Sequence, residues 1–171
     1  MVQKKVSDSY TTFTQIVMPN DTNSMYNLMG GNLLKWMDIA CGICGGKHSN
    51  RIVVTAAVDN VSFNRPIKIG DVVTINAQIT RSFNTSMEIF VEVYKENFRA
   101  PEKLKCNEAF YTFVALDEDG RPVKSNEIIP ENEDEQKRFV SALRRRELRL
   151  ILAGRMKPKE AKELKALFLN D

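Results

Sequence analysis

The sequence predicts an α+β fold in which a strongly curved antiparallel sheet wraps one buried helix. One segment in the N-terminal third has apolar residues at helical spacing, and four strand-like runs follow it. These runs reach about ten residues, whereas strands commonly have about five or six. Long strands around a single apolar helix imply a strongly curved sheet, and a helical segment ends the chain.

A strand and a loop are predicted before the helix. Residues 11–18 are rich in β-branched and aromatic side chains, which favour a strand. Residues 19–24 (Pro-Asn-Asp-Thr-Asn-Ser) are turn formers and predict a loop.

The helix is predicted to begin at Asn32 and to end at Gly45-Gly46, which is about fourteen residues. Asn32 is a candidate N-cap because its side chain can accept hydrogen bonds from the free amides of the first turn. The segment is mostly apolar, so we expect it to be buried. Its apolar residues at helical spacing are Leu33, Leu34, Trp36, Met37, Ala40 and Ile43.

Four strands are predicted after the helix, at residues 52–63, 72–81, 86–96 and 104–116. The second and third alternate in hydrophobicity, as strands with two different faces do. Turn formers separate the runs, and Asp117-Glu118-Asp119-Gly120 ends the last of them.

Residues 131–171 differ from the rest of the chain in charge and pattern. They hold eleven Lys and Arg against eight Asp and Glu, so the whole net charge of +3 lies there. Residues 1–130 have fourteen of each sign. An apolar stripe predicts helices, with Pro158 starting a second, short one. We therefore expect a domain at 1–130 and a basic helical extension at 131–171, to which the sequence assigns no role.

The counts of histidine and cysteine exclude several chemistries. A zinc site built mainly on histidine needs two or three of them, and the chain has only His48, which is favoured as a capping or surface residue at the helix end. Three cysteines cannot all pair within one chain. Cys41 and Cys44 have Cys-x-x-Cys spacing, but a metal site usually needs two more ligands, so core packing is favoured. We expect no metal and no cofactor.

The N-terminus indicates a cytoplasmic protein. No apolar run follows its lysines, so a signal peptide is not expected. No segment approaches the roughly 20 apolar residues of a membrane span, so no membrane partner is expected either. The odd number of cysteines agrees with a reducing compartment.

Asp38 is the strongest candidate for chemistry because it is a carboxylate within an apolar helix. Burying a carboxylate is costly unless it is hydrogen-bonded or functional, and the residues alone support both interpretations equally. Gly30 and Gly31 allow close approach of the backbone, and the free amides of a helix N-terminus suit an oxyanion. Tight packing is the alternative for these glycines. Asn23, taken by itself, is an ordinary turn residue.

Five short blocks stand in order over about residues 10 to 125. They are Met18-Pro19-Asn20-Asp21-Thr22-Asn23; Gly30-Gly31-Asn32-Leu33-Leu34-Lys35-Trp36-Met37-Asp38; Val54-Thr55-Ala56 with Asp59 and Phe63-Asn64-Arg65-Pro66 before Gly70-Asp71; Thr85-Ser86-Met87-Glu88; and Phe113-Val114-Ala115-Leu116-Asp117. Each block is weakly specific, but together they resemble the acyl-CoA thioesterases of the hotdog fold, a family with brain-type and bacterial acyl-CoA hydrolases.

The resemblance implies a fold, an activity and a site. It implies a hotdog domain that hydrolyses fatty acyl-CoA to free acid and CoA, with Asp38 as base or nucleophile and Asn23 acting with it across a subunit interface. It implies a homodimer at least, and a hexamer of three dimers. The oxyanion would be held at Gly30 and Gly31. The implied CoA contacts are Arg65, Arg81, Thr85 and Ser86, with an ordinary surface position as the alternative for the two arginines.

The sequence departs from the family pattern close to Asn23. Tyr26 and Met29 stand where the family often has a glycine and an aromatic residue, and Ser24 stands where proline is common. These positions lie near the acyl entrance in such enzymes, so the preferred acyl chain stays open. Direct attack by Asp38, activation of water, and regulation by a nucleotide also stay open.

Two other classes of function compete with hydrolysis. A hotdog dehydratase would need His48 beside a carboxylate, and the end of the helix is a poor place for it. A non-catalytic acyl-CoA-binding or nucleic-acid-binding protein is the third possibility, motivated by the basic run 144–149. No aromatic residues are interleaved there for base stacking, which disfavours nucleic acid.

Overall fold

The structure is a computed structural model that describes residues 2–59 and 61–169. The chain divides into two compact units, Met1–Ile129 and Pro130–Asp171. Among the described residues, no helix combines the length and the hydrophobicity that a membrane crossing requires.

The first unit is built on a five-stranded antiparallel sheet with strand order β2-β4-β5-β6-β3. Its two longest strands, β5 and β6, are neighbours at the centre, and β2 and β3 form the two edges. The bounds are β2 Thr11–Ile16, β3 Ile52–Asp59, β4 Val72–Ser82, β5 Ser86–Asn97 and β6 Ala100–Leu116. This arrangement confirms the predicted antiparallel sheet.

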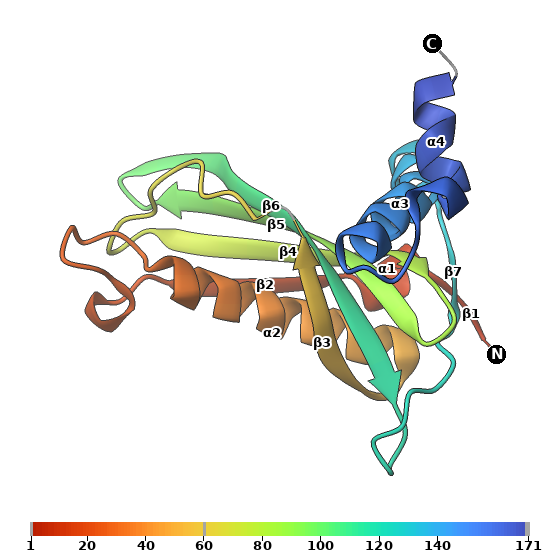
Figure 1. Ribbon diagram of the computed structural model, residues 1–171. Helices are drawn as coiled ribbons and strands as arrows, with labels where there is room; N and C mark the ends of the chain where they lie inside the picture. The colour runs from red at the N-terminus through yellow and green to blue at the C-terminus, as the bar shows by residue number, and fades with distance from the viewer. Residues whose placement is uncertain (1, 60, 170–171) are drawn as a thin grey trace. The chain divides into compact units, whose positions relative to one another are not determined.

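Helix α2 (Gly30–Ser49) runs along the inner face of the curled sheet and contacts all five strands (Figure 1). Its buried side chains recur every three or four residues, so one side of the helix meets the sheet. Alternate residues of the strands face the helix. On β5 these are Met87, Ile89, Val91 and Val93, all completely buried. The buried helix surrounded by a curved sheet is therefore as predicted.

The ends of α2 differ from the prediction. The helix begins at Gly30 after the N-cap Met29, so Asn32 lies in its first turn, where its side-chain amide donates to the Asp21 carbonyl at 3.2 Å. Gly45-Gly46 does not stop it. A side chain at Gly45 would lie 3.4 Å from Ile89 and Met87, so glycine allows the close packing of helix on sheet.

The helix instead ends at Asn50. This residue has left-handed backbone angles (φ 53°, ψ 36°), and its amide donates to the Gly46 carbonyl at 2.8 Å. Asparagine tolerates this conformation better than most residues, which explains the stop.

Some strand ends also differ from the prediction. Strand β3 leaves the sheet at Asp59, and β6 begins at Ala100 because the Asn97 side chain accepts the Arg99 amide at 3.0 Å and closes a short hairpin. Four short elements were not predicted. They are β1 (Gln3–Lys5), which pairs in parallel with β7 (Glu127–Ile129), the helical turn α1 (Val6–Ser9), and the 3-10 helix η1 (Pro19–Asp21).

The second unit is helical, as the sequence predicts. Helix α3 (Glu133–Leu152) is capped by Asn132, whose side chain accepts the Glu135 amide at 3.0 Å. A 3-10 turn, η2 (Pro158–Glu160), leads into α4 (Lys162–Leu169). The Leu164 amide donates to the Glu147 carboxylate at 2.7 Å and ties α4 to α3.

Candidate functional site

A groove of about 590 Å³ opens beside α2 in the first unit, where the helix passes strands β3 and β6. Its walls are mostly apolar, with one carboxylate among them. The lining residues are Leu34, Lys35, Asp38, Val58, Val61 and Tyr111. An apolar hollow with few polar groups is the usual form of a small-molecule site.

Asp38 lies at the border between the buried and exposed sides of α2. Trp36 and Met37 before it and Ala40 after it are buried, whereas Ile39 faces outward. The carboxylate is therefore half-buried rather than enclosed. We expected a buried carboxylate from the apolar sequence around it, and the phase of the helix places it at the rim instead.

Thr55 on β3 completes this corner of the groove. Its hydroxyl donates to Asp38 Oδ1 over 2.6 Å. The register between β3 and β6 shifts directly after it, from Thr55 opposite Phe113 to Ala57 opposite Thr112, so Ala56 is an extra residue. Such bulges re-aim neighbouring side chains and are common beside active sites. No role for Thr55 was predicted, because one threonine among the β-branched residues of a strand is no signal of function.

Tyr111 forms the floor of the groove. Its side chain is almost completely buried, and its hydroxyl donates to the Leu34 carbonyl at 3.4 Å. Burial raises the pKa of the Tyr111 phenol well above its usual value, and the neighbouring Cys41 and Asp38 raise it further. Tyr111 therefore stays protonated and serves as a rigid wall.

Asn23 does not line the groove within its own chain. It lies in the exposed loop before α2, and its side-chain oxygen accepts the amides of Met25 at 2.9 Å and Asn27 at 3.2 Å. Its side-chain amide nitrogen donates to none of the described residues. The single chain thus leaves Asn23 and Asp38 apart, with the amide nitrogen of Asn23 presented from an exposed loop.

Gly30 and Gly31 form the N-terminus of α2, as required of an anion-binding helix end. A side chain at Gly30 would lie 3.0 Å from the ring of Phe63, which is exposed and would have to shift to make room. Gly31 has open space around it, and its amide belongs to the first turn, which has no acceptor within the helix.

The four candidate CoA contacts lie at opposite ends of strand β4. Arg65 is exposed in the loop that leads to the start of β4. Arg81 lies near the far end of the same strand, nine residues beyond its first residue Val72, which is about 30 Å of extended chain. Thr85 and Ser86 belong to the hairpin that follows Arg81, and the Thr85 carbonyl accepts the Ala115 amide at 3.1 Å. One chain therefore does not bring Arg65 and the other three together.

His48 is a core residue and not a surface cap. It is completely buried, and its Nε2 lies 2.8 Å from Ser82 Oγ and 2.9 Å from the Asn126 carbonyl. Desolvation lowers the pKa of its imidazole. It lies in the last turn of α2, whereas Asp38 lies near the middle, so His48 supplies no acid or base to the groove.

Cys41 and Cys44 are free and buried, in agreement with core packing. Burial raises the pKa of the Cys44 thiol to about 12, so the thiolate that a metal or a redox reaction needs is disfavoured. Within the described part of the chain, His, Cys, Asp and Glu form no group of three that could hold a metal ion.

The outer edge of β3 is an exposed apolar surface. Ile52 is 70% exposed, and Val54 and Val58 on the same strand are also exposed. Ile39 and Ile43 add apolar surface from the outward side of α2. An exposed edge strand with apolar side chains is suited to pairing with another chain.

A curled antiparallel sheet around one helix, with a groove between them, defines a hotdog protein. The thioesterase superfamily model matches residues 25–101. The uncharacterized acyl-CoA thioester hydrolase YkhA of Bacillus subtilis is 38% identical over 75% of this chain and 74% of its own. The human cytosolic acyl coenzyme A thioester hydrolase is 35% identical over 78% of this chain, which spans 36% of that protein.

Solved structures agree with these relatives. A hexameric acyl-CoA thioesterase in its apo form has a TM-score of 0.86 and 33% identity, over 90% of this chain and 98% of its own. An acyl-CoA hydrolase from Staphylococcus aureus, in complex with butyryl coenzyme A and coenzyme A, has a TM-score of 0.82 and 31% identity, over 90% and 95%. The chain belongs to the acyl-CoA thioesterase family of the hotdog fold and is a thioester hydrolase.

The staphylococcal hydrolase has also been solved as three variants. Alanine replaces an asparagine in one variant and an aspartate, 15 positions later, in another. In the third it replaces a threonine 17 positions after the aspartate.

Proposed function

We propose that the protein hydrolyses fatty acyl-CoA thioesters to a free acid and CoA, at a site made by Asp38 and Thr55 of one chain and Asn23 of a second copy. The intervals between these three residues in the sequence are the observation that carries this proposal. Asn23, Asp38 and Thr55 stand 15 and 17 positions apart, in the order and at the intervals of the three substituted positions of the staphylococcal hydrolase.

The corner of Asp38 and Thr55 supports a role in activating the attacking group. Thr55 donates to one carboxylate oxygen of Asp38 at 2.6 Å, which orients a carboxylate that lines the groove and can act on a water or a thioester carbon. In hydrolysis, an oxygen–carbon bond forms, the carbon–sulfur bond breaks, and the thiolate of CoA takes up a proton.

Asn23 and the glycine pair complete the chemistry. The side-chain oxygen of Asn23 is engaged by its own loop, so its NH₂ group is the part that can donate to the thioester or orient the water. The amides of Gly30 and Gly31 at the start of α2 can stabilise the oxyanion that develops on the thioester oxygen.

A second copy is required because one chain leaves Asn23 apart from the groove. The exposed apolar edge of β3, beside Asp38, is the surface that we assign to this copy. We infer a homodimer as the minimum and a homohexamer of three dimers as the larger assembly, since the apo acyl-CoA thioesterase of similar structure is hexameric. Half-sites that meet across a two-fold axis give two complete sites for each dimer.

The CoA portion would be held by contacts from both copies. In this proposal Arg65 binds CoA phosphates from one end of β4, while Arg81, Thr85 and Ser86 of the other copy bind CoA from the opposite end of that strand. A cytoplasmic location is inferred from the human relative, whose name includes the word cytosolic.

Release of free thiol from acyl-CoA substrates of increasing chain length tests the proposal. We expect turnover on fatty acyl-CoA and a loss of about a hundredfold or more in Asp38→Ala, as for removal of a positioned base or nucleophile. Asp119→Ala is the matched control, since Asp119 lies in an exposed turn and pairs only with Arg121 at 3.6 Å. Unchanged turnover in Asp38→Ala would rule out the assigned role.

A further inference from the structure

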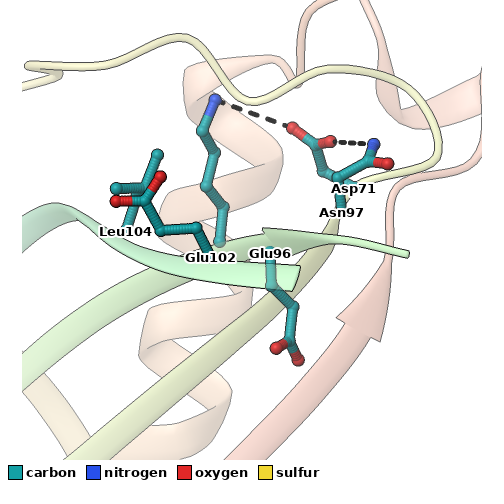
Figure 2. A pocket seen from close by; sticks show the side chains of 6 residues that line it. Asp71, Glu96, Asn97, Glu102 and Leu104 are labelled. Atoms are coloured by element: carbon teal, nitrogen blue, oxygen red, sulfur yellow. Dashed lines mark hydrogen bonds and ion pairs between the residues drawn. The ribbon is translucent and has the colours of Figure 1, made fainter. Parts of the chain in front are cut away.

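A second, smaller hollow of about 190 Å³ lies where the start of β4 meets the hairpin of β5 and β6 (Figure 2). Its walls carry charged and polar groups that bind one another. The lining residues are Asp71, Lys95, Glu96, Asn97, Glu102 and Leu104. Figure 2 shows the side chains of Asp71 and Asn97 side by side at the edge of this hollow, joined by a hydrogen bond.

Asp71 is the centre of these contacts and is only 5% exposed. Its Oδ1 accepts the Asn97 side-chain amide at 2.9 Å. Its Oδ2 accepts the Lys68 backbone amide at 2.9 Å and lies 3.7 Å from the Lys95 ammonium. A carboxylate this deeply buried would be costly without such partners, so the surrounding groups hold it in one place.

The same contacts hold the segment 66–71 against strand β5. Lys95 donates to the Pro66 carbonyl at 2.6 Å at one end of the segment, and Asp71 binds Asn97 at the other. Arg65, the arginine we assign to CoA phosphates, directly precedes this fixed segment.

The segment 66–71 in turn holds the loop that carries Asn23. The Leu28 amide donates to the Ile67 carbonyl at 2.7 Å, and the Ile69 amide donates to the Tyr26 carbonyl at 3.0 Å. Asn27 and Lys68 form an isolated β-bridge between the same two stretches. The path from Asp71 to the Asn23 loop therefore starts with the bond of its carboxylate to the Lys68 amide and continues through main-chain hydrogen bonds.

Tyr26 shows that this loop needs to be held. Its φ of 58° lies in the left-handed region, which is unfavourable for a bulky side chain. Its amide donates to the Asn23 carbonyl at 2.9 Å, so the turn that presents Asn23 includes the strained residue. Strained turns at functional sites persist only when their surroundings fix them.

We propose that Asp71 is a positioning residue, which, through the segment 66–71, fixes both the Asn23 loop and Arg65. The inference rests on the proposed function, since it assigns Asp71 an effect on turnover through Asn23. Asp71 itself touches no substrate. Its carboxylate orients the protein groups that do.

Asp71→Asn tests the proposal because it keeps the size of the side chain and removes the charge that Lys95 and Asn97 bind. We expect kcat to fall about tenfold or more in fully folded enzyme, as for a small displacement of a catalytic group. The KM for acyl-CoA should rise as well, because Arg65 is released. The double variant Asp71→Asn/Asn97→Asp restores a carboxylate–amide pair with the roles exchanged, and should recover much of kcat.

Introducing Asp71→Asn into enzyme that already carries Asn23→Asp distinguishes a positioning role of Asp71 from a general contribution to stability. If Asp71 acts through Asn23, Asp71→Asn should cost little further kcat once Asn23 is changed. An equal loss in both backgrounds would overturn the proposal. Lys105→Met is the matched control: it breaks ion pairs with Glu92 at 2.7 Å and Glu108 at 2.6 Å, which do not contact the segment 66–71, and should leave kcat unchanged.

Hydrogen exchange supplies a readout that does not depend on activity. The amides of Tyr26 and Ile69 should exchange faster in Asp71→Asn, and in Lys95→Met if Asp71→Asn folds poorly, but not in Lys105→Met. Unchanged protection of these amides in both Asp71→Asn and Lys95→Met would contradict the proposal. Unchanged kcat in Asn23→Asp alone, with the expected loss of protection in Asp71→Asn, would instead contradict the proposed role of Asn23.

Discussion

Asp38 lies on α2 and Thr55 on the edge strand β3, and one hydrogen bond of 2.6 Å joins them within a single chain. We call this pair the core side of the site, because the packing of α2 on the sheet places it. Asn23 lies on an irregular loop, outside the groove, and main-chain bonds to the segment 66–71 hold that loop. The first part of the proposed site is placed by hydrophobic packing of α2 on the sheet. The second is placed by a polar network and needs another copy to meet its partner, so the two parts should respond differently to substitution.

The largest effect is expected at the loop, from Asn23→Asp. Aspartate keeps an oxygen that can accept the Met25 and Asn27 amides, so the loop should survive, but it replaces the NH₂ donor with a negative charge. We expect kcat to fall by about a hundredfold or more, as for loss of a donor to a developing oxyanion. Thiol-release kinetics measure this, and activity close to that of the unchanged enzyme would reduce Asn23 to a turn residue.

A smaller effect is expected on the core side, from Thr55→Val. Valine keeps the β-branched shape but cannot donate to Asp38, so the carboxylate loses its orientation while the strand stays packed. We expect about a tenfold loss of kcat, within the usual range for an orienting hydrogen bond. Thr55→Ser should retain most of the activity. Thr14→Val on the opposite edge strand, where the threonine is exposed, should change nothing.

The smallest effect on turnover is expected at His48, which stabilises the C-terminal end of α2. Its pKa is lowered in the folded state, so below about pH 6.5 the unfolded chain binds a proton that the folded chain resists. The free energy of unfolding should therefore fall as the pH drops through this range, by up to about 1.4 kcal/mol for each pH unit.

Denaturant unfolding at pH 7.5 and pH 5.5 measures this dependence. His48→Gln should be less stable at pH 7.5 but should lack that part of the pH dependence, with kcat of the folded enzyme unchanged. A wild-type stability that rises on acidification in this range would show that the imidazole is not held neutral.

The core side of the site was easier to predict from sequence than the loop side. A lone carboxylate among Trp36, Met37 and Ala40 makes Asp38 a candidate by residue type and helical spacing, although the residues alone support a functional and a structural role equally. Its helix was predicted, but not the end at Ser49, because the low helix propensity of Gly45 is outweighed by its close packing on the sheet. Thr55 was missed because its role depends on a bulge, and local sequence does not specify the register of two strands.

The loop side could be predicted only through resemblance to a family. Asn23 lies among turn-forming residues, and the local sequence contains no other signal of its role. The network around Asp71 joins the loop at 23–28 to the segment 66–71 and to Asn97, and residues so far apart leave no periodic pattern in the sequence. Nor did the sequence indicate that His48 is enclosed, since Ser82 and Asn126 reach it from distant segments.

A complementation experiment tests most directly the claim that the two parts meet across copies of the chain. Asp38→Ala and Asn23→Asp, each inactive alone, are co-expressed with different tags, and the assemblies that contain both chains are compared with random mixtures. In a random mixture of the two variants, half of the dimers contain both chains. In each of these dimers, one of the two sites has both native residues. We therefore predict about one quarter of the wild-type activity for the random mixture. Activity no greater than that of the separate variants would contradict the shared site.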